Sequence, residues 1–303
     1  MPPDGPLTWV AREGPTVIGQ HATMPVRLWV KGREVLGAWA TDVMVAPERQ
    51  RQGLGDVLVR TWEQHVGAAL GLGHSASSAG LMRKLGWPNV GPVPVMVKPL
   101  TRRALRQPNW PLWINRFVSA VTLPVVRVIA RAKPLRAEVV PLRRFGNEFT
   151  VLWDRLAPKF DFAVRRDAPY LNWKFLEPPH IRYSLVALTR AGELQGYAVY
   201  RHRHEPRGRV TLLVDFLVDP DDELGVKTLL RWIDREARAA DSDKIRTACM
   251  HNGYGRIMKR SGYFRVRSPL EFTARVKAFA PPADFYSNTA RWHVTLGDAD
   301  QDR

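Results

Sequence analysis

Residues 40–62 read A-T-D-V-M-V-A-P-E-R-Q-R-Q-G-L-G-D-V-L-V-R-T-W, and the rest of the chain is organised around this stretch. Its β-branched and apolar residues 41–46 predict a strand, which stops at Pro47 because proline has no N–H for a ladder hydrogen bond. A basic loop containing Gly53 and Gly55 follows. The next segment predicts a helix with apolar residues near one face, Val57, Leu58, Trp62 and Val66.

The loop and the helix after it predict an anion-binding site. Glycines let backbone N–H groups approach a ligand closely, and the helix N-terminus adds the positive end of its dipole. The sequence lacks the Walker pattern G-x-x-x-x-G-K-[ST], and the third glycine of a dinucleotide fingerprint would fall on Leu58. What remains is Gln50-x-x-Gly53-x-Gly55 after a strand that ends in V-A-P.

This pattern resembles the acyl-CoA loop of the GNAT acyltransferase superfamily, Q/R-x-x-G-x-G/A, which lies between the fourth strand and the following helix. Residues 74–87, H-S-A-S-S-A-G-L-M-R-K-L-G-W, resemble the superfamily's late helix, often written N-x-x-A-x-x-L-Y-x-K-x-G-F. Here Ser77 or Ser78 is the expected helix cap, and Gly86 is expected to end the helix in a left-handed turn. The resemblance covers residues 7–98.

The resemblance implies that the loop amides hold the CoA pyrophosphate and that the strand pairs with the pantetheine arm. A backbone N–H near Met44 or Val45 would polarise the thioester carbonyl. Arg49 and Arg51 would either contact phosphates or form a solvated basic rim. The residues that the resemblance assigns to cofactor binding are Met44, Val45, Gln50, Arg51, Gln52, Gly53, Leu54, Gly55 and Asp56.

Acyl transfer to an amine also needs a base, and Asp42 is the first candidate because it shares a strand face with Met44. Asp215 has the same place in the second half of the chain, which favours a structural role for both aspartates. His74, after the next strand, is the second candidate, although a lone histidine there is often a hydrogen-bonded core residue. Met82 stands where many superfamily members have a tyrosine that protonates the leaving thiolate, so a serine among residues 75–78 or a water would have to donate instead.

The composition is that of a globular protein, with 303 residues, 45% hydrophobic and 25% charged. The only cysteine, Cys249, indicates a reducing compartment, and residues 1–6 lack the pattern of a signal peptide, so the expected location is the cytoplasm. The eight histidines show no zinc-binding spacing. Asp298 and Asp300 in the acidic tail are more typical of a solvated terminus than of a cation site, so no metal is predicted.

The element order after residue 7 is three strands, a helix, a short strand, the late helix and a last strand at residues 93–99. It fits the GNAT core but lacks that fold's opening strand and two helices, which wall the acceptor pocket. Either another part of the chain builds that wall, or the sequence as given starts late. The second half contains candidates for the missing helices at residues 146–160 and 167–175.

The second half also repeats the first. Residues 42–47 (D-V-M-V-A-P) match 215–220 (D-F-L-V-D-P), and residues 82–87 match 258–263, with nearly the same spacing between the members of each pair. The proline pair at residues 2–3 matches the pair at residues 178–179, which lies as far along the chain from it as residues 258–263 lie from residues 82–87. In the second half the glycine loop is replaced by three acids, Asp221, Asp222 and Glu223, which would repel a pyrophosphate.

The predicted fold is therefore α/β, with two tandem GNAT-like domains that each have a mixed, mostly antiparallel sheet flanked by helices. Residues 1–100 form the domain with the acyl-CoA loop, 101–140 a basic linker, 141–277 the domain without the loop, and 278–303 a tail. Ten basic residues and one acid give residues 101–145 a net charge of +9 out of +17 for the chain. The apolar part of the linker, 109–132, is either a helix packed across both domains or an amphipathic helix at a membrane surface.

The sequence favours an acyl-CoA-dependent N-acyltransferase, with acetyl-CoA as the expected co-substrate and an amine of a small molecule or cell-envelope precursor as acceptor. Tandem GNAT-like domains also resemble the Fem-type transferases, which use aminoacyl-tRNA, and the basic linker would suit RNA. The intact acyl-CoA loop speaks against that alternative and against a nucleic-acid partner. A third alternative is a non-catalytic CoA-binding or scaffold protein, which Met82 and the missing front elements motivate. The sequence leaves the oligomeric state open.

Overall fold

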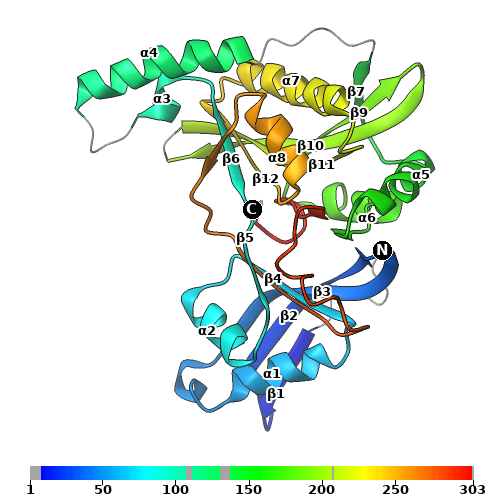
Figure 1. Cartoon of the computed structure of the whole chain (residues 1–303). Helices are drawn as coiled ribbons and strands as arrows, with labels where there is room; N and C mark the ends of the chain where they lie inside the picture. The colour runs from blue at the N-terminus through cyan, green and yellow to red at the C-terminus, as the bar shows by residue number, and fades with distance from the viewer. Residues whose placement is uncertain (1–7, 107–110, 130–136, 207, 302–303) are drawn as a thin grey trace.

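The computed structural model describes residues 8–106, 111–129, 137–206 and 208–301. The proline pair 2–3 and the ends of the predicted linker helix lie outside these residues. Figure 1 shows two lobes, each built on a sheet, with α6 and the C-terminal segment between them. The described helices are α1 (Leu54–Glu63), α2 (Ala76–Lys84), α3 (Arg102–Leu105), α4 (Leu112–Ile129), α5 (Asn147–Leu156), α6 (Ala168–Phe175), α7 (Glu223–Ala239) and α8 (Asn252–Lys259).

The lower lobe in Figure 1 contains an eight-stranded mixed sheet over the described residues. Its order is β15 (Trp292–His293), β8 (Phe162–Val164), β2 (Thr16–Val30), β3 (Arg33–Val45), β4 (Ala68–Leu72), β14 (Glu271–Val276) and β5 (Asn89–Pro92), and β1 (Thr8–Glu13) pairs with β2. The three-stranded meander that the sequence predicts is thus β1, β2 and β3. Helices α1 and α2 cover one face through a small core that includes Val59, Trp62 and Met82.

The upper lobe contains a seven-stranded sheet. Its order is β13 (Phe264–Val266), β6 (Val95–Pro99), β12 (Lys244–Ala248), β11 (Gly208–Val218), β10 (Glu193–Glu205), β9 (Ser184–Arg190) and β7 (Glu138–Leu142). Helix α7 packs against β10 and β11 with a buried apolar stripe that includes Val226, Leu230 and Ile233. Both sheets are mixed and flanked by helices, as the fold prediction states.

The two lobes exchange one strand each. β6, which the sequence places at the end of the first domain, pairs with β12 and β13 in the upper sheet. β14, from the end of the second domain, pairs with β4 and β5 in the lower sheet. Each sheet is therefore completed by a strand from the other half of the chain, and one continuous core of buried residues runs through both lobes.

The second half also adds a strand to the other edge of the lower sheet. β8 pairs antiparallel with the end of β2, and the backbone N–H of Arg165 donates to the carbonyl of Arg27 at 2.7 Å. The Arg165 guanidinium then bonds Glu34 on β3 at 2.8 Å. Residues 161–165 thus extend the first sheet at the edge that β2 forms.

Helix α4 contacts α3 and β6 on the upper lobe. Its buried side chains include Asn115, Ser119 and Val126, and Val126 lies against Gly262 of the second half. Trp113 and Phe117 are 70% and 67% exposed. The helix therefore contacts residues from both halves of the chain, but within one lobe. No helix among the described residues is both long and apolar enough to span a bilayer.

Candidate functional site

A cleft opens where β3 and β4 separate. The two strands pair in parallel from Gly37/Ala68 to Trp39/Leu70, and at Thr41 an extra residue in β3 shifts its register against β2. Such a bulge bends a strand and increases its twist, so the continuation of β3 turns away from β4. The resulting cavity has a volume of about 290 Å³. Its lining includes Asp42, His74, Ser75, Ser78 and Met82.

The same irregularity recurs in the upper sheet. β11 and β12 pair in parallel up to Leu212/Arg246, and an extra residue at Val214 shifts the register of β11 against β10. Thr41 directly precedes Asp42 and Val214 directly precedes Asp215, so the two irregularities have equivalent places in the matching sequence motifs. The neighbouring strands thus separate at the same place in the two sheets.

The acyl-CoA loop forms a concave backbone segment at the end of β3. Arg51 and Gly53 both have left-handed backbone conformations, with φ angles of 62° and 86°. Positive φ is unfavourable for arginine, and strain of this kind is often found at binding sites. A Cβ at Gly53 would meet nothing within 4 Å, so space is open on the outer side of the loop. Left-handed residues occur in the backbone nests that bind anions, in which successive N–H groups point toward one place.

Helix α1 begins directly at this loop without a side-chain cap. Its N-cap is Gly53, and no side chain in the described part of the chain caps the first turn. The N–H groups of Leu54, Gly55 and Asp56 therefore face outward together with the positive end of the helix dipole. The helix buries Leu58, Val59 and Trp62, as the amphipathic pattern predicts, but Val57 is 60% exposed.

Side chains around the loop brace it. The Gln50 side-chain amide donates to the carbonyl of Val45 at 3.1 Å, and Gln52 donates to the carbonyl of Glu48 at the same distance. Asp56 bonds Lys84 of α2 at 2.7 Å. Arg49 pairs with Glu13 on β1 and so turns away from the loop, whereas Arg51 is exposed beside it. The prediction that Arg49 contacts phosphates therefore has no support in this geometry.

The N–H of Val45 points into the cleft side of β3. Ala46 donates its N–H to Ile18 on β2 at 2.9 Å. Backbone groups of successive residues in a strand point to opposite edges, so the N–H of Val45 points away from β2. Beyond Trp39 this edge of β3 is not paired with β4. Of the two residues expected to polarise a thioester carbonyl, Val45 rather than Met44 has a suitably directed N–H.

Asp42 is exposed and lines the cavity. Its backbone carbonyl accepts a hydrogen bond from Nδ1 of His21 at 3.2 Å, and His21 in turn packs edge-on against Trp62. Burial lowers the pKa of His21, although its bond to the Asp42 carbonyl acts in the opposite direction. The sequence analysis missed His21, whose burial inside a strand gives no local signal.

His74 lies on the opposite wall of the cavity, two residues beyond β4. Its Nε2 is 2.7 Å from the hydroxyl of Thr273 on the exchanged strand β14. Burial lowers the pKa of His74, which keeps the ring neutral at pH 7. His74 is thus hydrogen-bonded, and its partner comes from the second half of the chain.

The late helix α2 presents hydroxyl groups to the same cavity. Ser75, rather than Ser77 or Ser78, caps the helix by accepting a hydrogen bond from the N–H of Ser78 at 3.2 Å. The Ser75 hydroxyl donates to Ser78 Oγ at 3.1 Å, which leaves the Ser78 proton free to point into the cavity. Met82, one turn further, is buried. Gly86 has a φ of 71° and ends the helix in the predicted left-handed turn.

In the second half, the helix equivalent to α1 is α7, and acidic side chains cap its N-terminus. Asp222 accepts a hydrogen bond from the N–H of Gly225 at 3.0 Å, and Asp221 bonds Lys159 at 2.7 Å. Side-chain oxygens thus occupy the helix N-terminus that would otherwise bind an anion. This arrangement agrees with the sequence-based expectation that the second half has no pyrophosphate site.

The cleft of the second half is filled by the C-terminal segment. The N–H of Gly297 donates to the carbonyl of Val214 at 3.0 Å, and the N–H of Met250 donates to Val294 at 3.1 Å. Cys249, next to the end of β12, forms an isolated bridge with Thr295. Residues 293–298 therefore lie between the two separating strands, where the first half has its cavity.

A buried ionic network locks this segment in place. Arg166 bonds Asp215 at 3.0 Å and Asp298 at 2.8 Å, and all three side chains are at most 2% exposed. Tyr197 donates to Asp215 at 2.6 Å, and Thr295 does so at 2.8 Å. The expectation of a solvated acidic terminus is thus wrong for Asp298. Over the described residues, no group of three or more histidine, cysteine, aspartate or glutamate side chains is placed to hold a metal ion.

Comparison with known families agrees with this geometry. Residues 6–89 match the family described as an Acetyltransferase (GNAT) domain. This part of the chain matches a GNAT domain, and it contains the glycine loop, α1 and most of the residues that line the cleft. Among curated proteins, no sequence matches.

Solved structures share the fold over most of the chain at low sequence identity. A GCN5-related N-acetyltransferase from Anabaena variabilis has a TM-score of 0.63 at 14% identity, over 89% of this chain and 62% of its own. A probable N-acyltransferase from Enterococcus faecalis has 0.59 at 12%, with the same coverages. Saccharomyces cerevisiae N-myristoyltransferase with bound myristoyl-CoA has 0.54 at 15%, over 91% and 68%. This chain thus spans 62% of the length of each of the first two proteins.

Proposed function

We propose that this protein is an acyl-CoA-dependent N-acyltransferase that binds its acyl donor in the N-terminal domain. The observation that carries the proposal is the uncapped N-terminus of α1, with Arg51 and Gly53 in left-handed conformations, at the end of the β3–β4 cleft. These residues fit a pyrophosphate, and the unpaired edge of β3 fits an extended pantetheine arm. Acetyl-CoA would supply a thioester at the cavity. A volume of about 290 Å³ is small beside typical ligand pockets and favours a short acyl group.

Each residue of the cleft then has its own role in the reaction. The Val45 N–H stabilises negative charge on the thioester oxygen. Asp42 takes the proton of the attacking amine as the C–N bond forms and the C–S bond breaks, and the thiolate receives a proton through the Ser78 hydroxyl. His74 is an alternative base, since it is neutral and lies across the same cavity. Met82 carries no proton to donate, so the proposal assigns that role to Ser78.

The second half acts as a structural partner in this proposal. The C-terminal segment lies between its separated strands. The second half also supplies Gln301, which lines the first cleft, and Thr273, which is hydrogen-bonded to His74 in that cleft. The matching bulges at Thr41 and Val214 support a tandem repeat in which one copy keeps the cofactor site. Burial raises the pKa of Cys249 to about 12, so its thiol is inert. Because a single cysteine is typical of a reducing compartment, we place the reaction in the cytoplasm.

Calorimetric titration with acetyl-CoA and CoA tests the proposal. We expect saturable binding by the wild type and none by a folded Gly53→Glu/Gly55→Glu variant, because two carboxylates would repel the pyrophosphate at the helix N-terminus. Turnover is then measured against an amine library by release of the free thiol. Absence of acetyl-CoA binding by the wild type would refute the proposal.

Two other outcomes distinguish the alternatives. Tight CoA binding without turnover of any amine would identify a CoA-binding or scaffold protein, as Met82 suggests. Binding of aminoacyl-tRNA without acetyl-CoA binding would identify a Fem-type transferase. The uncapped α1 terminus favours CoA binding over the Fem-type outcome, and the turnover assay separates a transferase from a CoA-binding scaffold.

A further inference from the structure

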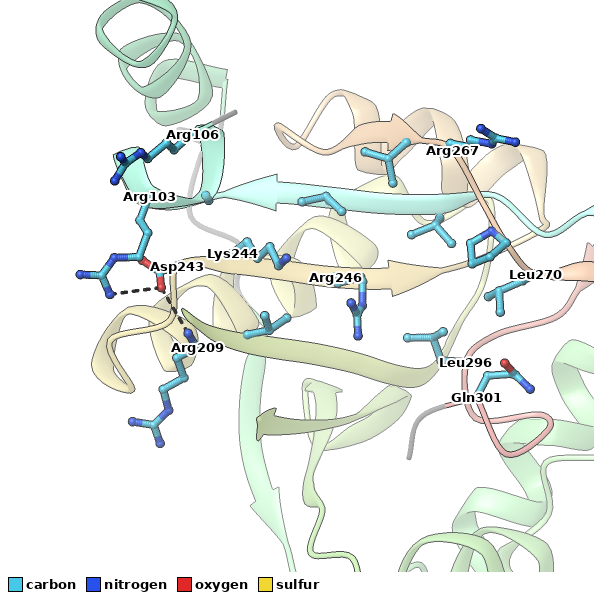
Figure 2. Close-up of a pocket in the computed structure, with 16 residues that line it drawn as sticks. Arg103, Arg106, Arg209, Asp243, Lys244, Arg246, Arg267, Leu270, Leu296 and Gln301 are labelled. Atoms are coloured by element: carbon cyan, nitrogen blue, oxygen red, sulfur yellow. Dashed lines mark hydrogen bonds and ion pairs between the residues drawn. The ribbon is translucent and has the colours of Figure 1, made fainter. Parts of the chain in front are cut away.

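A second cavity, of about 540 Å³, lies on one face of the upper sheet over β6, β12 and β11 (Figure 2). We call it the basic groove. Its floor is apolar and includes Val97, Val210 and Leu296. Its basic lining residues are Arg103, Arg106, Arg209, Lys244, Arg246 and Arg267. A single acid, Asp243, is part of the lining.

Half of these cations already have acidic partners. Arg103 lies 3.8 Å from Asp243, and Glu205 pairs with Lys244 at 3.7 Å and with Arg246 at 2.7 Å. Within the described ranges, the side chains of the other three cations form no ion pair, so their charge is uncompensated there.

Arg106 and Arg267 are exposed and have no acidic partner among the residues that the structure describes. Within the same part of the chain, Nε of Arg209 is buried without a hydrogen-bond acceptor. A buried donor without an acceptor is unfavourable, so an anionic ligand would stabilise the groove.

The basic groove adjoins the cleft of the first domain. Gln301 lines both cavities and donates to the carbonyl of Leu72, the last residue of β4, at 3.1 Å. In Figure 2 Arg103 and Arg106 lie at one end of the groove and Gln301 at the other, with Lys244 and Arg246 between them. The length of β12 along this path is about 13 Å, from the usual rise per strand residue. A ligand with its anion near Arg106 would thus extend toward the cleft.

We propose that the basic groove binds the acceptor, a small molecule with a phosphate group at one end, an apolar spacer, and the acylated amine at the other end. The phosphate lies among Arg103, Arg106 and Arg209, and the spacer lies on the valine floor. The role of the amine rests on the proposed function, whereas the anion site rests on the groove alone. No aromatic side chain is among the described residues that line the groove, which disfavours stacking of nucleic-acid bases.

The test is calorimetric titration of the full chain with 6-aminohexyl phosphate and with its uncharged counterpart, 6-aminohexanol. The groove variant is Arg103→Ser/Arg106→Ser, which removes two exposed arginines at the proposed phosphate end of the groove. Its matched control is Arg102→Ser/Arg116→Ser, which removes two exposed arginines of the same region that do not line the groove. The loop variant Gly53→Glu/Gly55→Glu reports whether the phosphate binds at the CoA loop instead.

We expect the wild type and the control to bind the phosphate equally, and the loop variant to retain this binding. The groove variant should bind roughly 10-fold or more weakly, because each charge-assisted contact is strong. 6-Aminohexanol should bind weakly to every form. Equal binding by the groove variant, or loss in the loop variant, would overturn the proposal.

Competition by tRNA that 6-aminohexyl phosphate cannot displace would also overturn it, in favour of RNA. Failure of the proposed function appears separately, as absence of acetyl-CoA binding by the wild type in the same instrument. Phosphate binding that is lost only in the groove variant would in that case still support the anion site.

Discussion

Asp42 and Asp215 occupy equivalent places in the two halves of the chain, each directly after the bulge in its sheet, and replacing each with asparagine separates chemistry from stability. Asp215 accepts hydrogen bonds from Arg166, Tyr197 and Thr295 in a fully buried network. Asparagine presents an NH₂ group to at least one of these donors. Removing one partner of a buried ion pair costs about 3–5 kcal/mol.

We expect the lower end of this range for Asp215→Asn, because Arg166 keeps its bonds to Asp298 at 2.8 and 2.9 Å. A loss of about 3 kcal/mol lowers the melting temperature by roughly 6–12 °C in a protein of this size. Asp42 is exposed, so Asp42→Asn should change the free energy of unfolding by less than about 0.5 kcal/mol. It should lower kcat by about 10²–10⁴-fold if Asp42 is the base.

The assay combines thermal unfolding, followed by circular dichroism, with thiol release on the best amine of the library. The expected pattern is a stable, inactive Asp42→Asn and a destabilised Asp215→Asn that keeps activity below its melting temperature. An Asp42→Asn variant with kcat close to that of the wild type would refute the assignment of the base and leave His74 as the candidate. An unchanged melting temperature for Asp215→Asn would refute the argument that its ion pair holds the C-terminal segment.

Three further predictions concern other parts of the structure. Ser78→Ala should lower kcat while the exposed neighbour Ser77→Ala does not, and equal rates for both variants would remove Ser78 as the proton donor. Burial lowers the pKa of His251 from 6.5 to about 4, and its Nδ1 accepts a hydrogen bond from Gly253. Between those pH values the unfolded chain therefore protonates His251 more readily than the folded chain does, so the contribution of His251 to stability should be complete above pH 6.5 and decline toward pH 4. Urea titrations should show a shallower decline for His251→Asn. An identical pH profile for this variant would contradict burial of His251 as the cause. Trp113, Phe117 and Val121 form an exposed apolar stripe on α4 beside Arg116, so flotation with anionic vesicles should recover the wild type but less of Trp113→Ser/Phe117→Ser, and no recovery of the wild type would exclude membrane contact through α4.

The features that were predictable from sequence are those that local residues determine. Pro47 ends a strand, Gly53 and Gly55 open a helix, and Gly86 ends another, whatever the rest of the chain does. The cap of α2 was misplaced because Ser75, Ser77 and Ser78 are chemically alike, and only the backbone decides which hydroxyl meets a free N–H.

The strand exchange was not predictable in the same way. The apolar residues of β6 fit either sheet equally well, because a strand's own pattern specifies its buried face but not its neighbour. The pairing of β6 with β12 and that of β14 with β4 each join strands from opposite halves of the chain. The sequence-based prediction keeps each last strand in its own domain. It therefore does not place Thr273 next to His74.

The C-terminal segment shows the same limit in electrostatic terms. Asp298 looked solvated because acidic residues surround it in sequence, whereas its partner Arg166 is far away along the chain. Once Arg166 bonds both Asp298 and Asp215, the second cleft is closed by the chain itself, and the acids at the start of α7 bond to protein donors. The first cleft has neither feature: α1 is uncapped and Asp42 is exposed. The same backbone irregularity therefore supports a structural junction in one half and an open site in the other, and the difference lies in the few side chains that fill or leave the cleft.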